Sequence, residues 1–488
     1  MKQRLDDKLA GQLPPEWGEK ERTQARTLFY KALALLAHRH YGGKIQTFPR
    51  ADLPDADWYN VWYTPGVSAI STDIRDAGDD SFDLTSRGQT VAVLSDGTRV
   101  LGDGDVTPAG GMGVMEGKAY LMKMLGGVDA VPVCVDSRNA EGKPDADVLI
   151  DLAMRLSPSF GAINLEDISQ PNCYRVLDEL RERCSIPVWH DDAQGTGCVT
   201  VAGVLNALAV TGKDIGNVRF ALNGAGAANT TIARLLMAAG ADPGNMALFD
   251  TKGGLHAGRA DLEADARFYR KWELCRTTNP GRVERLEEWL KGADVLISLS
   301  RPGPGVIPGE WVAGMAEGAV VFACANPVPE IYPHEAKAAG AAVVATGRGD
   351  FPNQVNNSVG FPGILKGVLL VRARKISDGM ALAAARAIAA AAGRGGALGP
   401  ERIMPSMDEV EVHADVAAAV AGQACAEGLA RRPLEPEAVR AMAERDILRT
   451  RQAFADLKAT GFIAGPPEPL IDEAVRLAVR GVKGPNGK

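Results

Sequence analysis

The chain has 488 residues, enough for two or three domains with full hydrophobic cores, and its composition is that of an ordinary globular protein. Its formal net charge of −7 and its lack of any basic run argue against nucleic acid as the main partner, because binding phosphates requires concentrated Lys and Arg. The amino-terminal segment lacks the apolar core of a signal peptide, and no uncharged apolar stretch approaches the ~20 residues of a membrane span. We therefore expect a cytoplasmic protein with no membrane partner, in which the seven scattered cysteines are free thiols.

Three kinds of element are predicted in the first 200 residues. Apolar residues recur at helical spacing between residues 19 and 40, which predicts an amphipathic helix. Residues 90–101 predict a β-hairpin, because two β-rich arms, VAVL and TRVL, meet at the favoured turn pair Asp96-Gly97. The runs VPVCVD, GAINLED and IPVWH predict short strands, with helical stretches between them.

Strands and helices alternate regularly through the middle of the chain. A helix is predicted at 230–239, and strands are predicted at residues 218–222, 246–250, 295–299, 320–325 and 342–345. Unbroken apolar runs of this kind are typical of parallel strands buried on both faces, so the sequence predicts a doubly wound α/β sheet. We expect an N-terminal α/β domain for substrate and metal (1–200), a Rossmann-type dinucleotide-binding domain (201–430) and a helical C-terminal extension (431–488).

The segment VRFALNGAGAANTTIARLLMAAG has the pattern of a dinucleotide-binding turn. An apolar strand leads into Gly224 and Gly226, which allow the backbone to approach a pyrophosphate at the amino terminus of the next helix. Asp250 ends the following strand, 24 positions after Gly226, where an acid that binds ribose hydroxyls is expected. A tight strand-to-helix turn without a ligand has the same glycines, so the flanking elements and Asp250 carry the prediction. Asn229 stands at the third glycine position and is bulkier than close strand–helix packing usually accepts.

Two acidic pairs follow predicted strands. Glu166-Asp167 closes one strand in NLED, and Asp191-Asp192 follows another in HDDAQGT. Carboxylates at the ends of parallel strands converge on one edge of a sheet, where hard divalent cations find oxygen ligands. A single such pair would be interpreted as solvated helix caps, whereas two pairs ahead of a dinucleotide turn predict a metal site.

Three further side chains are candidates for chemistry. Lys118 lies in GGMGVMEGKAYL, where a glycine-rich apolar run opens a helix; desolvation there would lower its pKa and make it a base, although a solvated lysine fits the same sequence. Tyr63 precedes a Pro-Gly turn in WYTPGV, where a packed aromatic is the commoner role. Arg99 either clamps a carboxylate in bidentate fashion or is a surface strand residue.

Together these segments resemble the malic enzymes. YTPGV, SDGTRVLG, GMGVMEGKA, INLEDI, HDDAQGT, the GAGAA turn, ANPVPE, and DFPNQVNN followed by FPG occur in that family's order, over roughly residues 25–430. The compact length resembles the short bacterial form. Departures from that form are Ala193 and Gln194 in HDDAQGTG, Arg99, and Asp103 in LGDGD, so a divergent branch is expected.

The resemblance implies oxidative decarboxylation of malate to pyruvate and CO₂, with reduction of NAD⁺ or NADP⁺ and assistance from Mn²⁺ or Mg²⁺. It implies that Tyr63 is the general acid and Lys118 the general base. The implied metal ligands are Glu166, Asp167 and Asp191, with Asp192 assisting the metal site and catalysis. The implied cofactor-binding residues are Gly224, Gly226, Ala227, Ala228, Asn229, Asp250, Lys252 and Asn326. The implied substrate-binding residues are Arg99, Asn356 and Asn357.

The resemblance also implies a dicarboxylate substrate and a homodimer or an assembly of dimers. Asp250 favours NAD⁺ because it would repel a 2′-phosphate, whereas Lys252 would pair with that phosphate. The alternatives are another 2-hydroxy diacid, a malolactic conversion that retains the cofactor, and a catalytically silent NAD(P)-binding regulator.

Overall fold

The computed structural model describes residues 4–100, 103–394 and 396–483, and the chain forms two compact units. The smaller unit comprises Met1–Phe48 and Arg451–Lys488. Its helices α1 (Leu5–Ala10), α2 (Glu19–Tyr41) and α20 (Glu468–Lys483) share a small apolar core that includes Phe29 and Val475. The predicted helix over residues 19–40 is therefore confirmed, and it packs against the C-terminal helix α20.

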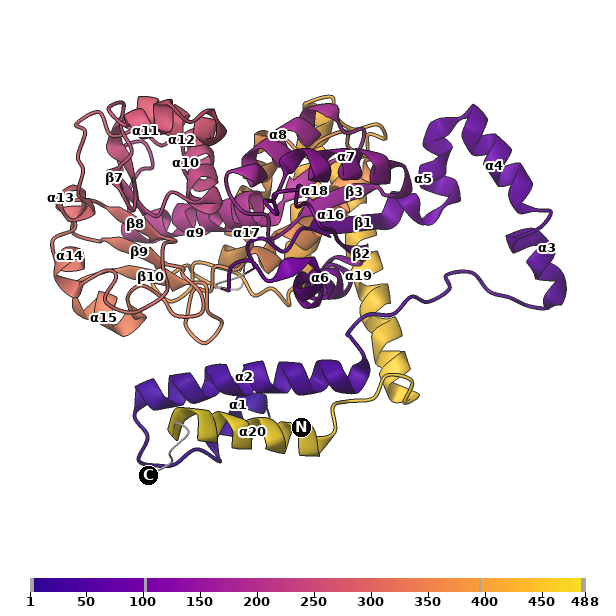
Figure 1. Cartoon of the computed structure of the whole chain (residues 1–488), viewed down its shortest axis with the longest axis horizontal. Coiled ribbons are helices and arrows are strands. Elements are labelled where there is room, and N and C mark those ends of the chain that lie inside the picture. The colour runs from indigo at the N-terminus through magenta and orange to yellow at the C-terminus, as the bar shows by residue number, and fades with distance from the viewer. Residues whose placement is uncertain (1–3, 101–102, 395, 484–488) are drawn as a thin grey trace. The chain divides into compact units, whose positions relative to one another are not determined.

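The larger unit, Pro49–Thr450, contains a parallel sheet of four strands in the order β2-β1-β3-β4 (Figure 1). The strands are β1 (Thr90–Ser95), β2 (Asp129–Cys134), β3 (Ala162–Leu165) and β4 (Val188–His190). The helices between them are α6 (Thr107–Gly126), α7 (Ala146–Leu156) and α8 (Asn172–Arg183). Before β1, residues 49–89 form the short helices α3 (Tyr59–Trp62), α4 (Val67–Asp76) and α5 (Ser81–Leu84).

The predicted hairpin over residues 90–101 is wrong. Its first arm is β1, but β1 pairs in parallel with β2 and β3 rather than with residues 98–100. The backbone N–H of Arg99 donates to the carbonyl of Asp167, and Val100 makes an isolated bridge with Gly104. Leu101 lies outside the described residues. Long-range pairing outweighs the local turn signal of Asp96-Gly97 because a central strand satisfies both of its edges at once.

The second sheet has six strands in the order β10-β9-β8-β5-β6-β7, all parallel except β7. The strands are β5 (Phe220–Asn223), β6 (Met246–Asp250), β7 (Gly253–Gly254), β8 (Val295–Ser298), β9 (Val320–Ala323) and β10 (Val343–Thr346). The flanking helices are α10 (Ala227–Ala239), α11 (Ala260–Glu263), α12 (Tyr269–Thr277), α13 (Leu286–Leu290), α14 (Gly309–Ala313) and α15 (Pro333–Ala338). The chain runs from β5 to β6 on one side and returns to build β8, β9 and β10 on the other. The predicted doubly wound sheet is confirmed, and its strand order reverses at β5, where ligands of such sheets bind.

One continuous core includes residues of both sheets and of the long helices that follow them. These helices are α9 (Thr196–Thr211), α16 (Phe361–Leu370), α17 (Asp378–Arg394), α18 (Val410–Ala426) and α19 (Pro436–Ala459). Among the described residues, Asp191–Thr211 is the one helical span that is long and apolar enough to cross a membrane, and 78% of its apolar window is buried inside the protein. That burial is what a core helix of a soluble protein shows. All seven cysteines are free, and five of them are buried.

Candidate active site

Four carboxylates meet at one edge of the four-stranded sheet. Strands β3 and β4 are parallel neighbours, with Leu165 opposite His190. The residues that follow them are the predicted pairs Glu166-Asp167 and Asp191-Asp192. The parallel pairing therefore brings together acids that are 24 or more positions apart in the sequence.

Three of these acids are suited to a divalent cation. Glu166, Asp167 and Asp192 each offer an oxygen, and the three oxygens lie within 4.8 Å of one another. Burial raises the pKa of Glu166 well above its usual range, and the nearby aspartates add to that rise while Lys118 opposes it. A set of hard oxygen ligands that repel one another, two of them buried and Asp192 partly exposed, fits Mn²⁺ or Mg²⁺. The structure thus differs from the expected ligand set, since it places Asp192 rather than Asp191 with Glu166 and Asp167.

Asp191 instead holds Lys118. The Lys118 ammonium donates to Asp191 Oδ2, and it lies 3.1 Å from Glu166 Oε1. The indole of Trp189 donates to the other oxygen of Asp191, at 3.1 Å. A Cβ atom on Gly195 would lie 1.9 Å from that same oxygen, so the position accepts glycine alone. Asp191 is fully buried, and its two oxygens have fixed partners.

The expected lowering of the Lys118 pKa is wrong for this chain without a bound ligand. Burial opposes the charged form, but Asp191, Glu166 and Asp192 outweigh it and raise the pKa of Lys118 above its usual range. The ring of Phe361, with its centroid 4.6 Å from Nζ, also favours the cation. Sequence reasoning anticipated the desolvation of this lysine but not the three carboxylates around it.

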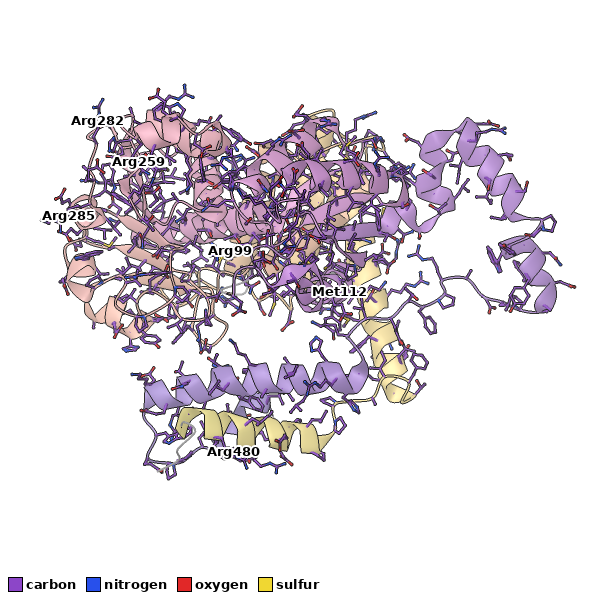
Figure 2. All side chains as sticks on the ribbon, viewed as in Figure 1. Arg99, Met112, Arg259, Arg282, Arg285 and Arg480 are labelled. Atoms are coloured by element: carbon purple, nitrogen blue, oxygen red, sulfur yellow. The ribbon has the colours of Figure 1, made fainter. Side chains whose placement is uncertain are left out.

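The predicted substrate-binding residues lie in two places. Arg99, labelled in Figure 2, is exposed, and its backbone N–H donates to the carbonyl of Asp167 at 3.0 Å. Asn357 lies beside Asp191, because its Cβ atom is 3.4 Å from the position a Cβ of Gly195 would take. The loop of Asn357 thus borders the carboxylate cluster.

Two other predicted residues have local roles in the structure. The side chain of Asn356 caps the short helix η8 (Asn357–Val359) by accepting from the N–H of Ser358 at 2.9 Å. Asn326 is exposed, and its amide lies 3.2 Å from the position a Cβ of Gly347 would take.

Tyr63 is not brought to this cluster. It follows α3 with 73% of its surface exposed, and no hydrogen bond or ion pair joins its phenol to Lys118 or to the carboxylates within the described residues. Its surroundings on residues 58–67 are also exposed and apolar, including Trp62 at 50% and Tyr59 at 60%. A single copy of the chain therefore leaves the predicted general acid in solvent.

The dinucleotide turn has the predicted form. Gly224 has φ +92°, and a Cβ on it would lie 2.4 Å from the carbonyl of Leu299, so the turn requires glycine. Gly226 precedes α10, and a Cβ there would meet no atom within 4 Å, which leaves open space at the amino terminus of the helix. Ala227 and Ala228 form the first turn of α10. The Asn229 amide donates to the carbonyls of Asn223 and Gly224 at 2.8 and 2.7 Å, so this larger residue ties helix to strand instead of separating them.

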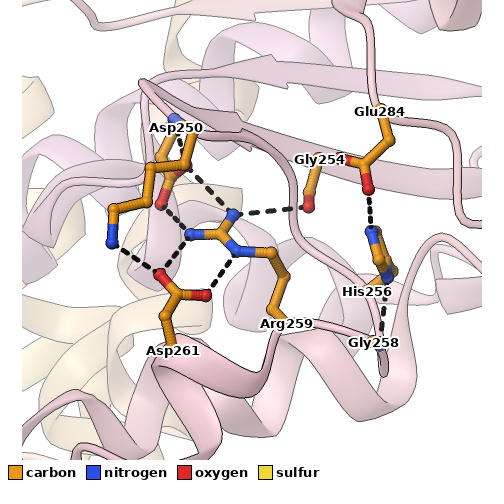
Figure 3. Close-up of polar contacts among 8 residues, drawn as sticks. Asp250, Gly254, His256, Gly258, Arg259, Asp261 and Glu284 are labelled. Atoms are coloured by element: carbon orange, nitrogen blue, oxygen red, sulfur yellow. Dashed lines mark hydrogen bonds and ion pairs between the residues drawn. The ribbon is translucent and has the colours of Figure 1, made fainter.

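The acid at the end of β6 has an ion-pair partner that sequence reasoning missed. Arg259 donates to both oxygens of Asp250 and to both oxygens of Asp261 (Figure 3). Lys252 completes the group through Asp261, at 2.9 Å. The one signal in the sequence is an arginine nine residues after Asp250, which by itself does not predict a contact.

Comparison with known proteins identifies relatives that span four fifths or more of the chain. A family model for the malic enzyme N-terminal domain matches residues 43–181, and one for the malic enzyme NAD-binding domain matches residues 193–425. The chain is 40% identical over 407 residues to the bifunctional malic/malolactic enzyme of Bacillus subtilis, spanning 83% of this chain and 96% of that enzyme. It is 41% identical over 394 residues to the NAD-dependent malic enzyme of Geobacillus stearothermophilus, spanning 80% and 79%. The crystal structure of the Entamoeba histolytica malic enzyme superposes with a TM-score of 0.95 at 55% identity, covering 99% of both chains.

Proposed function

Because the chain belongs to the malic enzyme family, we propose from the geometry which of its residues carry out the reaction of that family. The protein is an NAD(P)-dependent malic enzyme, which oxidises malate and decarboxylates the product to pyruvate and CO₂ with the help of a divalent cation. The observation that carries the residue assignment is Lys118 held among strand-end carboxylates. Incubation with malate, Mn²⁺ and either nucleotide, followed by measurement of reduced nicotinamide and pyruvate, tests it.

We propose that Glu166, Asp167 and Asp192 hold the divalent cation, and that Asp191 holds Lys118. In support, oxygens of Glu166, Asp167 and Asp192 lie within 4.8 Å of one another. Asp191 instead accepts a hydrogen bond from the Lys118 ammonium. When bound, such a cation acts as a Lewis acid that stabilises the negative charge developing on the substrate oxygens. The adjacent aspartates then serve different tasks because the π-helical segment η5 (Asp191–Gly195) turns them to different neighbours.

Lys118 accepts the proton of the 2-hydroxyl group of malate in this proposal. It can do so only when neutral, so the negative charge of Glu166 and Asp191 must first be compensated. The oxidised acid then loses its distal carboxyl group, and Tyr63 protonates the resulting enolate. Arg99, Asn356 and Asn357 orient the substrate carboxylates.

The cofactor is NAD⁺ or NADP⁺, and we propose that it lies across the carboxyl edge of the six-stranded sheet. Its pyrophosphate would meet the amino terminus of α10, where Gly224 to Asn229 form the turn. Asp250 and Lys252 would lie at the adenosine ribose, and Asn326 at the nicotinamide. The domain division expected from the sequence, 1–200, 201–430 and 431–488, is part of the same proposal.

We further propose a cytoplasmic homodimer in which residues 58–67 are covered. The support is the exposed apolar surface around Tyr63, because such patches mark interaction sites. This patch also carries Tyr63, the general acid that is missing from the carboxylate cluster around Lys118. One relative is named a malic/malolactic enzyme, so lactate should be measured together with pyruvate.

A further inference from the structure

Three arginines lie near the ring of Phe82 and a fourth adjoins them in the chain, and none of the four is among the residues assigned above to the active site. The Cζ atoms of Arg87, Arg372 and Arg431 lie 4.2, 5.6 and 5.6 Å from the ring centroid. Burial lowers the pKa of Arg431, and the charges of Arg374 and Arg372 lower it further while Asp79 opposes them, so Arg374 belongs to the same group. We refer to Arg87, Arg372, Arg374 and Arg431 as the Phe82 arginine cluster.

The fold itself brings the cluster together. After α16 the chain passes through residues 372–374, which pair in antiparallel fashion with residues 429–431 after α18. Arg374 N–H donates to the carbonyl of Leu429 at 2.9 Å, and Arg431 N–H to that of Arg372 at 3.3 Å. Backbone pairing therefore holds like charges side by side, and their mutual repulsion favours the binding of a counter-charge.

The guanidinium of Arg431 is incompletely paired. Its Nη2 donates to the carbonyl of Ser185 at 2.6 Å, and its Nε lies 3.9 Å from Asp79 Oδ2, which is a weak contact. Its Nη1 is buried and finds no hydrogen-bond partner among the residues that the structure describes. A buried charged donor without an acceptor is costly, and it points to a group that the protein alone does not supply.

The cluster also has an excess of positive charge. Within the described residues, its carboxylate partners are Asp79 and Asp83, which are 67% and 57% exposed. Arg87 donates to neutral oxygens, namely the Ser81 hydroxyl and the carbonyls of Phe160 and Ser157. Arginine does not lose its proton at physiological pH, so the excess of two charges cannot be relieved by titration.

We propose that the Phe82 arginine cluster binds a small dianion bearing a phosphate group, either free phosphate or a phosphate monoester. A phosphate offers three acceptor oxygens, so it can accept from several guanidinium groups at once, including the unpartnered Nη1 of Arg431. Its two negative charges match the excess of the cluster. This site is separate from the nucleotide and metal sites of the proposed function and does not depend on them.

Bound phosphate would compete with Asp79 for Arg431. Asp79 lies in the short helix η2 (Gly78–Asp80), directly after α4 and on the segment that carries Tyr63. A small anion bound at the cluster would therefore weaken the contact between Asp79 and Arg431, which helps to hold that segment.

Calorimetric titration of the full-length protein with inorganic phosphate, and separately with glycerol 3-phosphate, tests the proposal at constant ionic strength set with chloride. Arg431→Gln and Arg87→Gln should each weaken binding at least tenfold. The matched control is Arg155→Gln, which removes an exposed arginine paired with Asp151 on α7 and should leave binding unchanged. Asp79→Asn removes the competing acid and should tighten binding severalfold.

The two titrants distinguish the sources: binding of both supports recognition of the phosphate group, and binding of one identifies free phosphate or the ester. Absence of binding by both would overturn the proposal. So would binding that survives Arg431→Gln, because that signal would come from the nucleotide site. If Arg431→Gln fails to fold, Arg87→Gln and the exposed Asp79→Asn still decide, since unchanged affinity in both variants contradicts binding at the cluster.

Discussion

Nη1 and Nη2 of Arg259 each lie 3.0 Å from an oxygen of Asp250. The acid expected to favour NAD⁺ by repelling a 2′-phosphate is therefore neutralised before any nucleotide binds. Lys252 lies in the same group of charges, through Asp261. The physical basis for a strong NAD⁺ preference is thus removed.

Arg259→Ala should restore that preference. Freed of its partner, Asp250 would repel the 2′-phosphate, and we expect the ratio of kcat/KM for NAD⁺ over NADP⁺ to rise about tenfold, equivalent to about 1.4 kcal/mol. Arg267→Ala is the control, because Arg267 is exposed and pairs with Asp265 instead. An unchanged ratio in the Arg259 variant would show that Asp250 does not face the ribose.

Removal of the metal should abolish turnover. Excess EDTA should leave no activity, Mn²⁺ should restore it, and Asp167→Ala or Asp192→Asn should prevent the restoration while nucleotide binding stays within about twofold. Asp151→Asn, on the exposed face of α7, should behave as wild type. Full activity in EDTA contradicts the metal site, and a fully active Asp192→Asn would return the ligand role to Asp191.

Lys118→Ala should depress malate oxidation by ~10²–10⁴-fold, the usual contribution of a positioned base. Decarboxylation of added oxaloacetate begins without that proton removal, so it should suffer less. Lys123→Ala, on the same helix but partly exposed and paired with Asp129, is the control. If oxidation by the Lys118 variant stays within a few-fold of wild type, another group is the base.

Mixing two inactive variants should regenerate activity. If a second copy supplies Tyr63, then Tyr63→Phe and Lys118→Ala subunits that are unfolded, mixed and refolded together should form dimers with one intact site, and about a quarter of wild-type activity should return. Tyr59→Phe, at an exposed position on the short helix α3 that directly precedes Tyr63, should be active alone. No recovery, despite proven mixed dimers, would mean that Tyr63 acts within its own chain.

Asp178→Asn should destabilise the protein at neutral pH more than in acid. Burial works against the ionised form, but the hydrogen bonds and charge of Arg270 hold the pKa of Asp178 below its usual value. This stabilisation is complete above the unfolded-state pKa of ~3.9 and is lost as the pH falls through the lower folded-state pKa.

Arg270 is buried, and the Asp178 side chain is 36% exposed. We therefore expect a loss of about 2 kcal/mol at pH 7, less than for a fully buried pair, that shrinks below about pH 4. Urea unfolding of the wild-type and Asp178→Asn proteins between acid and neutral pH measures this loss. The control is Asp147→Asn, which removes an exposed ion pair with Arg175. A difference independent of pH would exclude the ion pair as its cause.

The sequence predicted the parts of the fold that depend on apolar runs. The strand at 246–250 was placed to the residue, and those at 295–299 and 342–345 to within one residue at each end, because buried parallel strands are continuous in hydrophobicity. The hairpin failed because Asp96-Gly97 is a local signal and β1 pairs with strands about 40 and 70 positions away. The division of tasks between Asp191 and Asp192 depends on the π-helical turn, and the Asp250–Arg259 pair on a loop, neither of which has a periodic signature.

The rate at which the buried cysteines react can report how often the structure around each of them opens. Thiol reagents react with the thiolate. Burial raises the pKa of Cys173 to about 12 and that of Cys275 to about 11, and it also raises the pKa of the buried Cys198 and Cys324. These thiols sit on α8, α9, α12 and at the end of β9, so they sample both sheets. Under native conditions, each cysteine can be alkylated only when its surroundings open, and mass spectrometry of the labelled peptides would time the opening of each sheet separately, without substrate, cofactor or metal.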